Sequence, residues 1–115
     1  MTRGEVYWAE LAPRSGSEQR GRRPVIVVSR DAFNQARGWH SLIVVPLSTS
    51  SAQTARGPTT VPLAPGSAGL RRPCYAVCHQ VTTLDRSKML AKIGALSHES
   101  LLRVASGLRI ALDLD

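Results

Sequence analysis

The sequence has few aromatic residues, only two cysteines and no long apolar segment. Tryptophan, tyrosine and phenylalanine make up 4% of its 115 residues, and they are scattered, without the interleaved pattern of a single-strand-binding platform. Its apolar runs are too short to span a membrane, and no charged-then-apolar signal segment opens the chain. We therefore expect a cytoplasmic protein without a membrane segment, built as one domain over residues 1–115.

Metal-binding and hydrolase motifs are missing as well. Cys74 and Cys78 are expected on one strand, with Cα atoms about 13 Å apart, too far for a disulfide. The same strand would point Cys78 and His79 to opposite faces, and no second cluster completes a tetrahedral site. No Gly-x-Ser-x-Gly elbow marks a serine hydrolase. We expect two packed core cysteines, no metal and no other cofactor.

Charge is strongly one-sided. Fifteen lysines and arginines oppose eight acidic residues, giving a net charge of +7. Thirteen of the fifteen cations are arginines, whose planar head group suits bidentate phosphate contacts. Such a field attracts a polyanion, either nucleic acid or an acidic protein.

The hydrophobic pattern predicts strands first and one long helix last. From Ser97 the apolar residues follow a helical period, with Ser97 as the N-cap. Residues 30–40 form either a short helix or a long loop, and residues 85–90 could form one helical turn. Trp8 and Tyr75 are expected in the core. The order predicts an α+β fold, a strongly curved, barrel-like antiparallel sheet packed on a C-terminal helix. The predicted strands cover residues 5–11, 24–29, 41–47, 59–63, 74–81 and 92–94.

Three places could carry chemistry. A basic loop over residues 14–23 ends in Arg23 at the edge of a strand, where a guanidinium can contact a phosphate; the alternative is a run of solvated turn charges. Hydroxyls at residues 48–51 follow another strand and can donate to a phosphoryl oxygen, although an ordinary serine-rich turn is the alternative. Trp39, in a loop, could stack on a base.

Five segments in this order resemble the MazF/PemK family of toxin endoribonucleases. Together with the closing helix they cover nearly the whole chain. The segments are Arg3–Trp8, Gly16–Gln19 continuing through Arg23–Val27, Asn34, Val45–Thr49 and Cys78–Asp85.

The resemblance implies a homodimer that binds single-stranded RNA across the dimer face. It also implies a cognate, MazE-like antitoxin with an acidic, disordered tail, and operator DNA bound only through the antitoxin complex. The family's essential arginine matches Arg23, its essential threonine matches Ser48, with Thr49 as the competing hydroxyl, and its loop glutamate matches Glu18. Residues expected to contact RNA are Gln19, Arg20, Arg22, Thr49, Trp39 and Gln80.

The reaction expected from such a site is attack by the RNA 2′-hydroxyl on the adjacent phosphate, without a metal. Arg23 stays protonated, so it would stabilise the phosphate, and Glu18 or a water would act as base. Two alternatives remain open. The first is a CcdB-like poison of gyrase, although the chain's last residues contain no aromatic side chain for that contact; the second is a catalytically inactive RNA- or antitoxin-binding module.

Overall fold

The computed structural model describes residues 1–11, 21–50 and 57–115. Within these residues two α-helices and several short 3₁₀ turns, one of them over residues 57–59, accompany seven strands. The strands are β1 (Glu5–Leu11), β2 (Gly21–Val27), β3 (Ser41–Ser48), β4 (Thr60–Leu63), β5 (Cys74–Val77), β6 (Thr82–Asp85) and β7 (Met89–Ala95). The helices are α1 (Asp31–Asn34) and α2 (His98–Ala111), and the other 3₁₀ turns are η2 (Ser67–Gly69), η3 (Cys78–Gln80) and η4 (Arg86–Lys88).

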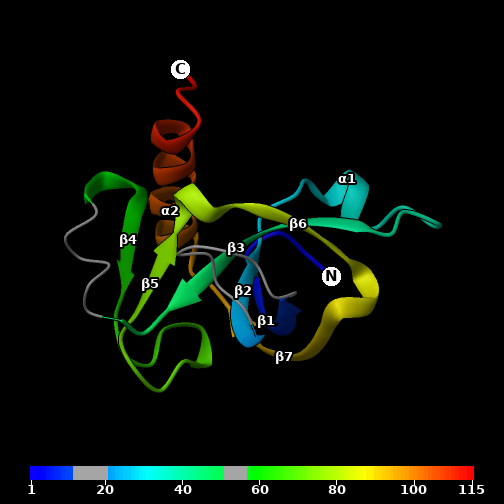
Figure 1. Cartoon of the computed structure of the whole chain (residues 1–115), viewed down its shortest axis with the longest axis horizontal. Helices are drawn as coiled ribbons and strands as arrows, with labels where there is room; N and C mark the ends of the chain where they lie inside the picture. Colours follow the sequence, from blue (N-terminus) through cyan, green and yellow to red (C-terminus); the bar gives the residue numbers. More distant parts are fainter. Residues whose placement is uncertain (12–20, 51–56) are drawn as a thin grey trace.

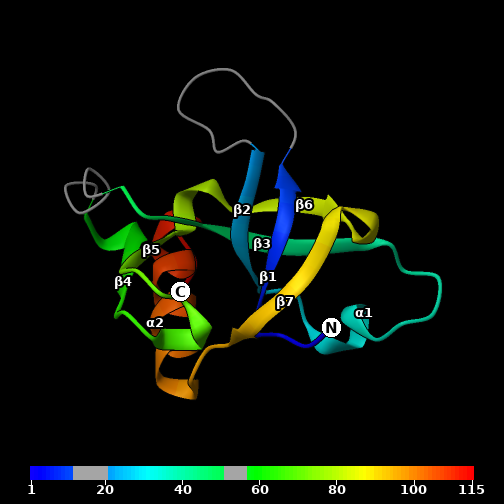
Figure 2. The ribbon, with the colours of Figure 1, turned by 90° about the horizontal axis from the view of Figure 1, so that it is seen from below.

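The strands form one antiparallel sheet in the order β4-β5-β3-β2-β1-β7, with β6 pairing beside β3. Strand β3 is its centre, because its first half pairs with β6, its middle with β2 and its end with β5. Figures 1 and 2 show the sheet curling so that β3 crosses β1 and β2 at a steep angle. The expected curved antiparallel sheet is confirmed, but in the described part of the chain its path ends at β4 and β7 and does not close.

The two faces of the curled sheet bury different clusters, because side chains alternate along each strand. On the face that α2 covers lies the helix-side cluster, whose buried members are Val6, Ile26, Val45, Leu47, Val61, Leu63, Leu70, Cys74, Ala76, Cys78 and Val104. On the other face lies the far-side cluster, whose buried members are Ala9, Leu11, Val25, Val27, Leu42, Val44, Leu84 and Met89. The β-branched runs of β2 and β3 feed both clusters, as expected of strands buried on both faces.

Helix α2 begins and packs as its sequence predicts. The Ser97 side chain accepts a hydrogen bond from the Ser100 backbone N–H and caps the first turn. Val104 is fully buried in the helix-side cluster. At Gly107 the helix comes so close to η3 that an added Cβ would lie 2.7 Å from the Cys78 sulfur. Glycine therefore sets the distance between helix and sheet at this point.

Three expectations about the strands are wrong in detail. Cys74 and Cys78 are both free and buried as predicted, but the chain leaves the strand after Val77 and turns in η3, so Cys78 and His79 do not alternate on one strand. Strand β2 begins at Gly21, which places Arg23 inside the strand and not in the preceding loop. Trp8 is 43% exposed and lies outside the core.

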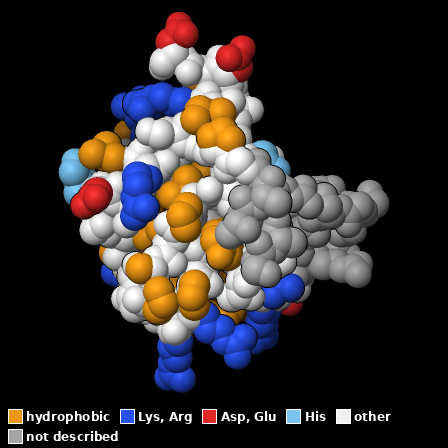
Figure 3. Space-filling model, turned by 90° about the vertical axis from the view of Figure 1, so that its left-hand side faces the viewer, with side chains coloured by type: hydrophobic (Ala, Val, Ile, Leu, Met, Phe, Trp, Pro, Cys, Tyr) orange, Lys and Arg blue, Asp and Glu red, His pale blue; other side chains and the backbone are white. Residues whose placement is uncertain are grey.

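One side of the molecule, over β4 and α2, has apolar side chains gathered across its middle with cationic side chains around them (Figure 3). Leucine and isoleucine side chains on and after α2, at positions 102, 110, 112 and 114, are at least 53% exposed.

Within the described residues, no helix combines the length and apolar character that crossing a bilayer requires.

Candidate active site

Arg23 and Ser48 lie at the same end of the β2–β3 pair. The antiparallel ladder pairs Val25 with Pro46, Ile26 with Val45 and Val27 with Val44. Arg23 comes two residues before Val25, and Ser48 comes two residues after Pro46. Side chains that differ by two positions point to the same face of a strand. Both residues therefore belong to the face that carries the far-side cluster, at the point where that face reaches the surface.

The side chains of Arg23 and Ser48 differ in their exposure to solvent. Arg23 is exposed and lies opposite Ala9 of β1, which provides a rigid strand as its base. Ser48 is half-buried and lies opposite Tyr75 of β5. Its Oγ accepts a hydrogen bond of 3.1 Å from the Ser50 backbone N–H. This bond occupies an acceptor site and leaves the hydroxyl proton able to donate to another group.

Thr49 and Arg22 occupy the opposite, helix-side face. Arg22 pairs with Glu10 across the β1–β2 ladder, and its Nε lies 3.2 Å from the carboxylate. Both side chains are largely exposed, so the pair contributes little to stability. Thr49 is exposed and lines a pocket together with Trp8 and Pro24. Arg22 and Arg23, and likewise Ser48 and Thr49, thus point to opposite faces of the sheet.

The other predicted RNA-contacting residues are not all brought to this end. Trp39 precedes β3, whose length from Ser41 to Ser48 is about 23 Å, and so lies beyond the end of the strand opposite to Ser48. It is 44% exposed and stacks on Phe33, with ring centroids 5.1 Å apart. Gln80 is half-buried at the end of η3, which directly follows β5. Glu18, Gln19 and Arg20 lie outside the described residues.

Several carboxylates serve structural roles. Glu5 accepts hydrogen bonds from Lys92, at 2.6 Å, and from the Tyr7 hydroxyl. Asp31 accepts from the Arg3 backbone N–H, which lowers the pKa of that carboxyl. Asp85 accepts from Ser87, with the same consequence for its pKa. These three groups hold turns and strand ends together, away from Arg23 and Ser48.

The cysteines are not reactive groups. Burial raises the pKa of the Cys78 thiol to about 11, and it also raises the pKa of Cys74. A neutral thiol is a poor nucleophile and a poor metal ligand. Among the described residues, no three histidine, cysteine or acidic side chains come together as a set of metal ligands.

Sequence reasoning missed Trp8, Arg71 and Arg72, which share the pocket beside Thr49. Trp8 stands in an apolar strand pattern that suggests burial, while the two arginines follow a loop between β4 and β5. A local sequence motif cannot indicate that Trp8 lies near Arg71 and Arg72, because they are more than sixty positions apart. The folding of the sheet brings these residues to one pocket.

A curled antiparallel sheet with one long C-terminal helix is the fold of a class of small bacterial toxins. The structure of MazF from Deinococcus radiodurans superimposes with a TM-score of 0.79 at 26% identity, covering 99% of this chain and 97% of that one. A MazE–MazF complex from the same organism gives a TM-score of 0.74 at 25% identity, covering 100% and 97%.

Sequence similarity extends along the whole chain. The chain is 35% identical over 114 residues to endoribonuclease EndoA of Bacillus subtilis, covering 99% of this chain and 96% of EndoA. It is 32% identical to endoribonuclease MazF of Staphylococcus epidermidis, covering 100% and 93%. Residues 2–112 match the family of PemK-like, MazF-like toxins of type II toxin–antitoxin systems. The chain belongs to this family.

Proposed function

We propose that the chain, as one domain over residues 1–115, is a toxin endoribonuclease that cuts single-stranded RNA without a metal ion. The observation that carries this proposal is the position of Arg23 and Ser48, a cation and a hydroxyl on one face at one end of the β2–β3 pair. The names of the relatives, endoribonuclease EndoA and endoribonuclease MazF, support the same activity.

In the proposed reaction the RNA 2′-oxygen attacks the adjacent phosphorus and the bond to the 5′-oxygen breaks. The products are a 2′,3′-cyclic phosphate and a 5′-hydroxyl. Arg23 stabilises the charge that builds on the phosphoryl oxygens, and the Ser48 hydroxyl donates to one of them. The 2′-hydroxyl proton goes to a base, either Glu18 or a water, and the leaving oxygen takes up a proton.

The structure favours Ser48 over Thr49 as the hydroxyl. Ser48 has the parity of Pro46 and Val44, which pair with Val25 and Val27, and Arg23 has the parity of those two residues. Thr49 has the opposite parity and lines the pocket on the helix side. A phosphate that contacts Arg23 therefore lies on the face to which Ser48 points, and Thr49 points to the other face.

The partners follow from the family and from surface chemistry. We propose a cytoplasmic homodimer that is inhibited by a MazE-like antitoxin with an acidic tail and reaches operator DNA only through that complex. The solved MazE–MazF complex supports the antitoxin, and a net charge of +7 suits both RNA and an acidic tail. The exposed apolar side chains of Figure 3 offer area that another chain can bury.

The test is incubation of the purified protein with a long RNA in excess EDTA, followed by analysis of the new ends. We expect discrete cuts with cyclic phosphate on one side and 5′-hydroxyl on the other. Intact RNA in both EDTA and magnesium would instead favour the gyrase poison or the inactive binding module, and cutting only with magnesium would contradict the metal-independent reaction.

A further inference from the structure

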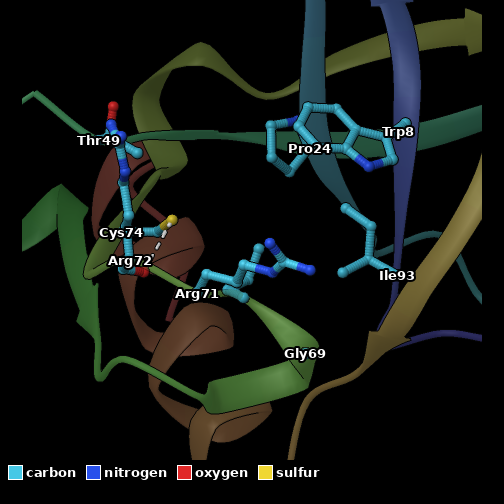
Figure 4. Close-up of a pocket in the computed structure, with 9 residues that line it drawn as sticks. Trp8, Pro24, Thr49, Gly69, Arg71, Arg72, Cys74 and Ile93 are labelled. Atoms are coloured by element: carbon cyan, nitrogen blue, oxygen red, sulfur yellow. Dashed lines mark hydrogen bonds between the residues drawn. The ribbon is translucent and has the colours of Figure 1, made fainter.

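A pocket of about 420 Å³ opens beside Thr49 on the helix-side face of the sheet. Figure 4 shows its two walls: Trp8 and Pro24 from β1 and β2 on one side, and the segment from Gly69 to Cys74 on the other. Ile93 of β7 lies next to Trp8. Arg71 directs its guanidinium into the space between the walls (Figure 4).

The lining combines an aromatic surface with positive charge. Trp8 is 43% exposed, which is unusual for an indole in a sheet with two buried clusters. Among the described residues that line the pocket, Arg71 and Arg72 are cationic and none is acidic. An apolar wall with an aromatic ring stabilises a flat ring by stacking, and two guanidinium groups stabilise an anion. A nucleotide carries both features.

The wall that holds the arginines is fixed in place by close backbone contacts. The turn before it closes with a hydrogen bond of 2.7 Å from the Gly66 N–H to the Leu70 carbonyl. A Cβ added at Gly69 would lie 2.7 Å from the Ile93 carbonyl oxygen, and one added at Gly94 would overlap the Ala68 carbonyl. Only glycine permits this approach of the turn to β7, so the pocket is formed before any ligand arrives.

The pocket adjoins the candidate active site through the backbone. Pro24 follows Arg23, Thr49 follows Ser48, and consecutive Cα atoms are about 3.8 Å apart. On the other side of Trp8, a second hollow of about 310 Å³ is lined by Arg22, Leu90 and Ala91. The indole therefore stands between two hollows, each with arginine in its lining.

We propose that the pocket binds a nucleotide of the RNA strand that flanks the scissile phosphate, with the base against Trp8 and a backbone phosphate at Arg71 and Arg72. This inference rests on the proposed function, since the RNA is the strand cut between Arg23 and Ser48. Leaving the catalytic face, the strand passes over the ends of β2 and β3 and enters the helix-side pocket. Trp8, Arg71 and Arg72 then contribute to affinity and to the choice of cleavage sequence.

The first experiment measures how RNA binding depends on salt, using an uncleavable 2′-O-methyl RNA and fluorescence anisotropy. Each lost phosphate contact lowers the slope of log affinity against log salt by about 0.7 for a single strand. We expect the double variant Arg71→Gln/Arg72→Gln, which loses the one phosphate held by both side chains, to lower this slope by about 0.7. The matched control, Arg37→Gln/Arg109→Gln, removes the same charge at exposed positions elsewhere and should change it much less. Equal slopes in the two variants would overturn the proposal.

The second experiment tests stacking by single-turnover cleavage of a long RNA. Trp8→Ala should raise the half-saturating enzyme concentration about tenfold to a hundredfold, the usual effect of losing one stacked base. Trp8→Phe keeps a ring and should recover most of this loss. If Trp8→Ala leaves the concentration unchanged, or if Trp8→Phe is as impaired as Trp8→Ala, the indole does not stack on RNA.

A third measurement identifies a competing occupant of the pocket. Sedimentation of the wild type and of both pocket variants should give the same oligomeric state. A shift of the variants to a lighter species, without a change in the salt slope, would assign the pocket to a second copy of the chain and refute the nucleotide. Failure of the proposed function is distinct, because then the wild type itself would not cut RNA.

Discussion

Replacing Ser48 by alanine removes one hydroxyl from the proposed catalytic pair and changes little else. The Ser48 Oγ accepts a hydrogen bond from the Ser50 N–H, which positions the oxygen before substrate binds and leaves its proton free to donate. If that proton reaches a phosphoryl oxygen in the transition state, its loss should lower the cleavage rate by about 10²–10³, which is the usual effect of removing one preorganised donor. Substrate affinity should change much less, because the contact strengthens only as charge develops.

The loss of activity can be separated from a loss of folding by magnitude. A rate loss of this size corresponds to about 2.7–4 kcal/mol of transition-state stabilisation. The Ser48 side chain accepts a hydrogen bond from the Ser50 N–H, and a bond of this kind contributes about 0.5–1.5 kcal/mol to stability. A domain of this size is stable by about 5–15 kcal/mol. Ser48→Ala should therefore stay folded while it loses nearly all of its activity.

The assay is single-turnover cleavage at saturating enzyme, with circular dichroism as the control for folding. Ser48→Thr should keep substantial activity, because it restores the hydroxyl. Thr49→Ala, one position along and on the other face, is the matched variant and should keep most of the maximal rate. A large loss for Thr49→Ala with none for Ser48→Ala would refute the assignment and move the catalytic hydroxyl to the helix-side face.

Four further outcomes are expected. Arg23→Ala should abolish cleavage without unfolding the protein, since the side chain is exposed; normal cleavage by the folded variant would contradict its role. An RNA with a single 2′-deoxy sugar at the cut site should resist cleavage, because the attacking oxygen is gone. Gly107→Ala should lower the free energy of unfolding in urea by about 1–3 kcal/mol, because overpacking against the Cys78 sulfur outweighs a gain in helix propensity of about 1 kcal/mol; combining it with Cys78→Ala should recover part of the loss. The pKa of Cys78 is raised to about 11 from 9.0, so the folded state holds this proton longer than the unfolded chain, and the free energy of unfolding should fall as pH rises from about 9 to about 11; in Cys78→Ala this part of the pH dependence should be absent.

The parts of the fold that follow a simple period could be predicted from the sequence. The β-branched runs of β2 and β3 indicate buried strands, and the spacing from Ser97 indicates α2, cap included. The turn at Cys78 could not be predicted in this way. It begins with a buried, apolar Cys78 that continues the pattern of the strand, and α2 packs closely against this residue at Gly107.

The candidate site was predictable only in part. The resemblance matches Arg23 and Ser48 to a family pattern, but nothing in either segment says that they share a face; that needs the register of β2 against β3. Trp8 stands in a run of β-forming residues and is expected in the core, but it is 43% exposed and lines two hollows of the surface. Which strand residues stay uncovered depends on the elements packed around them, and a single strand segment does not contain that information.

Alternation along the strands explains how one small sheet can serve both chemistry and recognition. In β2 the residues 22, 23 and 24 point in turn to the helix side, the far side and the helix side, and residues 48 and 49 divide in the same way at the end of β3. The far side then carries the proposed catalytic pair, while the helix side carries Arg22, Trp8 and the pocket beside Thr49.

Because side chains alternate with a period of two residues, a shift of one residue in the register of β3 would exchange Ser48 and Thr49 between these faces. The buried residues of β3 on both faces resist such a shift, because it would move Val45 and Leu47 out of one cluster and Leu42 and Val44 out of the other. The packing of the two clusters thus keeps the Ser48 hydroxyl on the same face of the sheet as Arg23, at positions that themselves contribute little to the core.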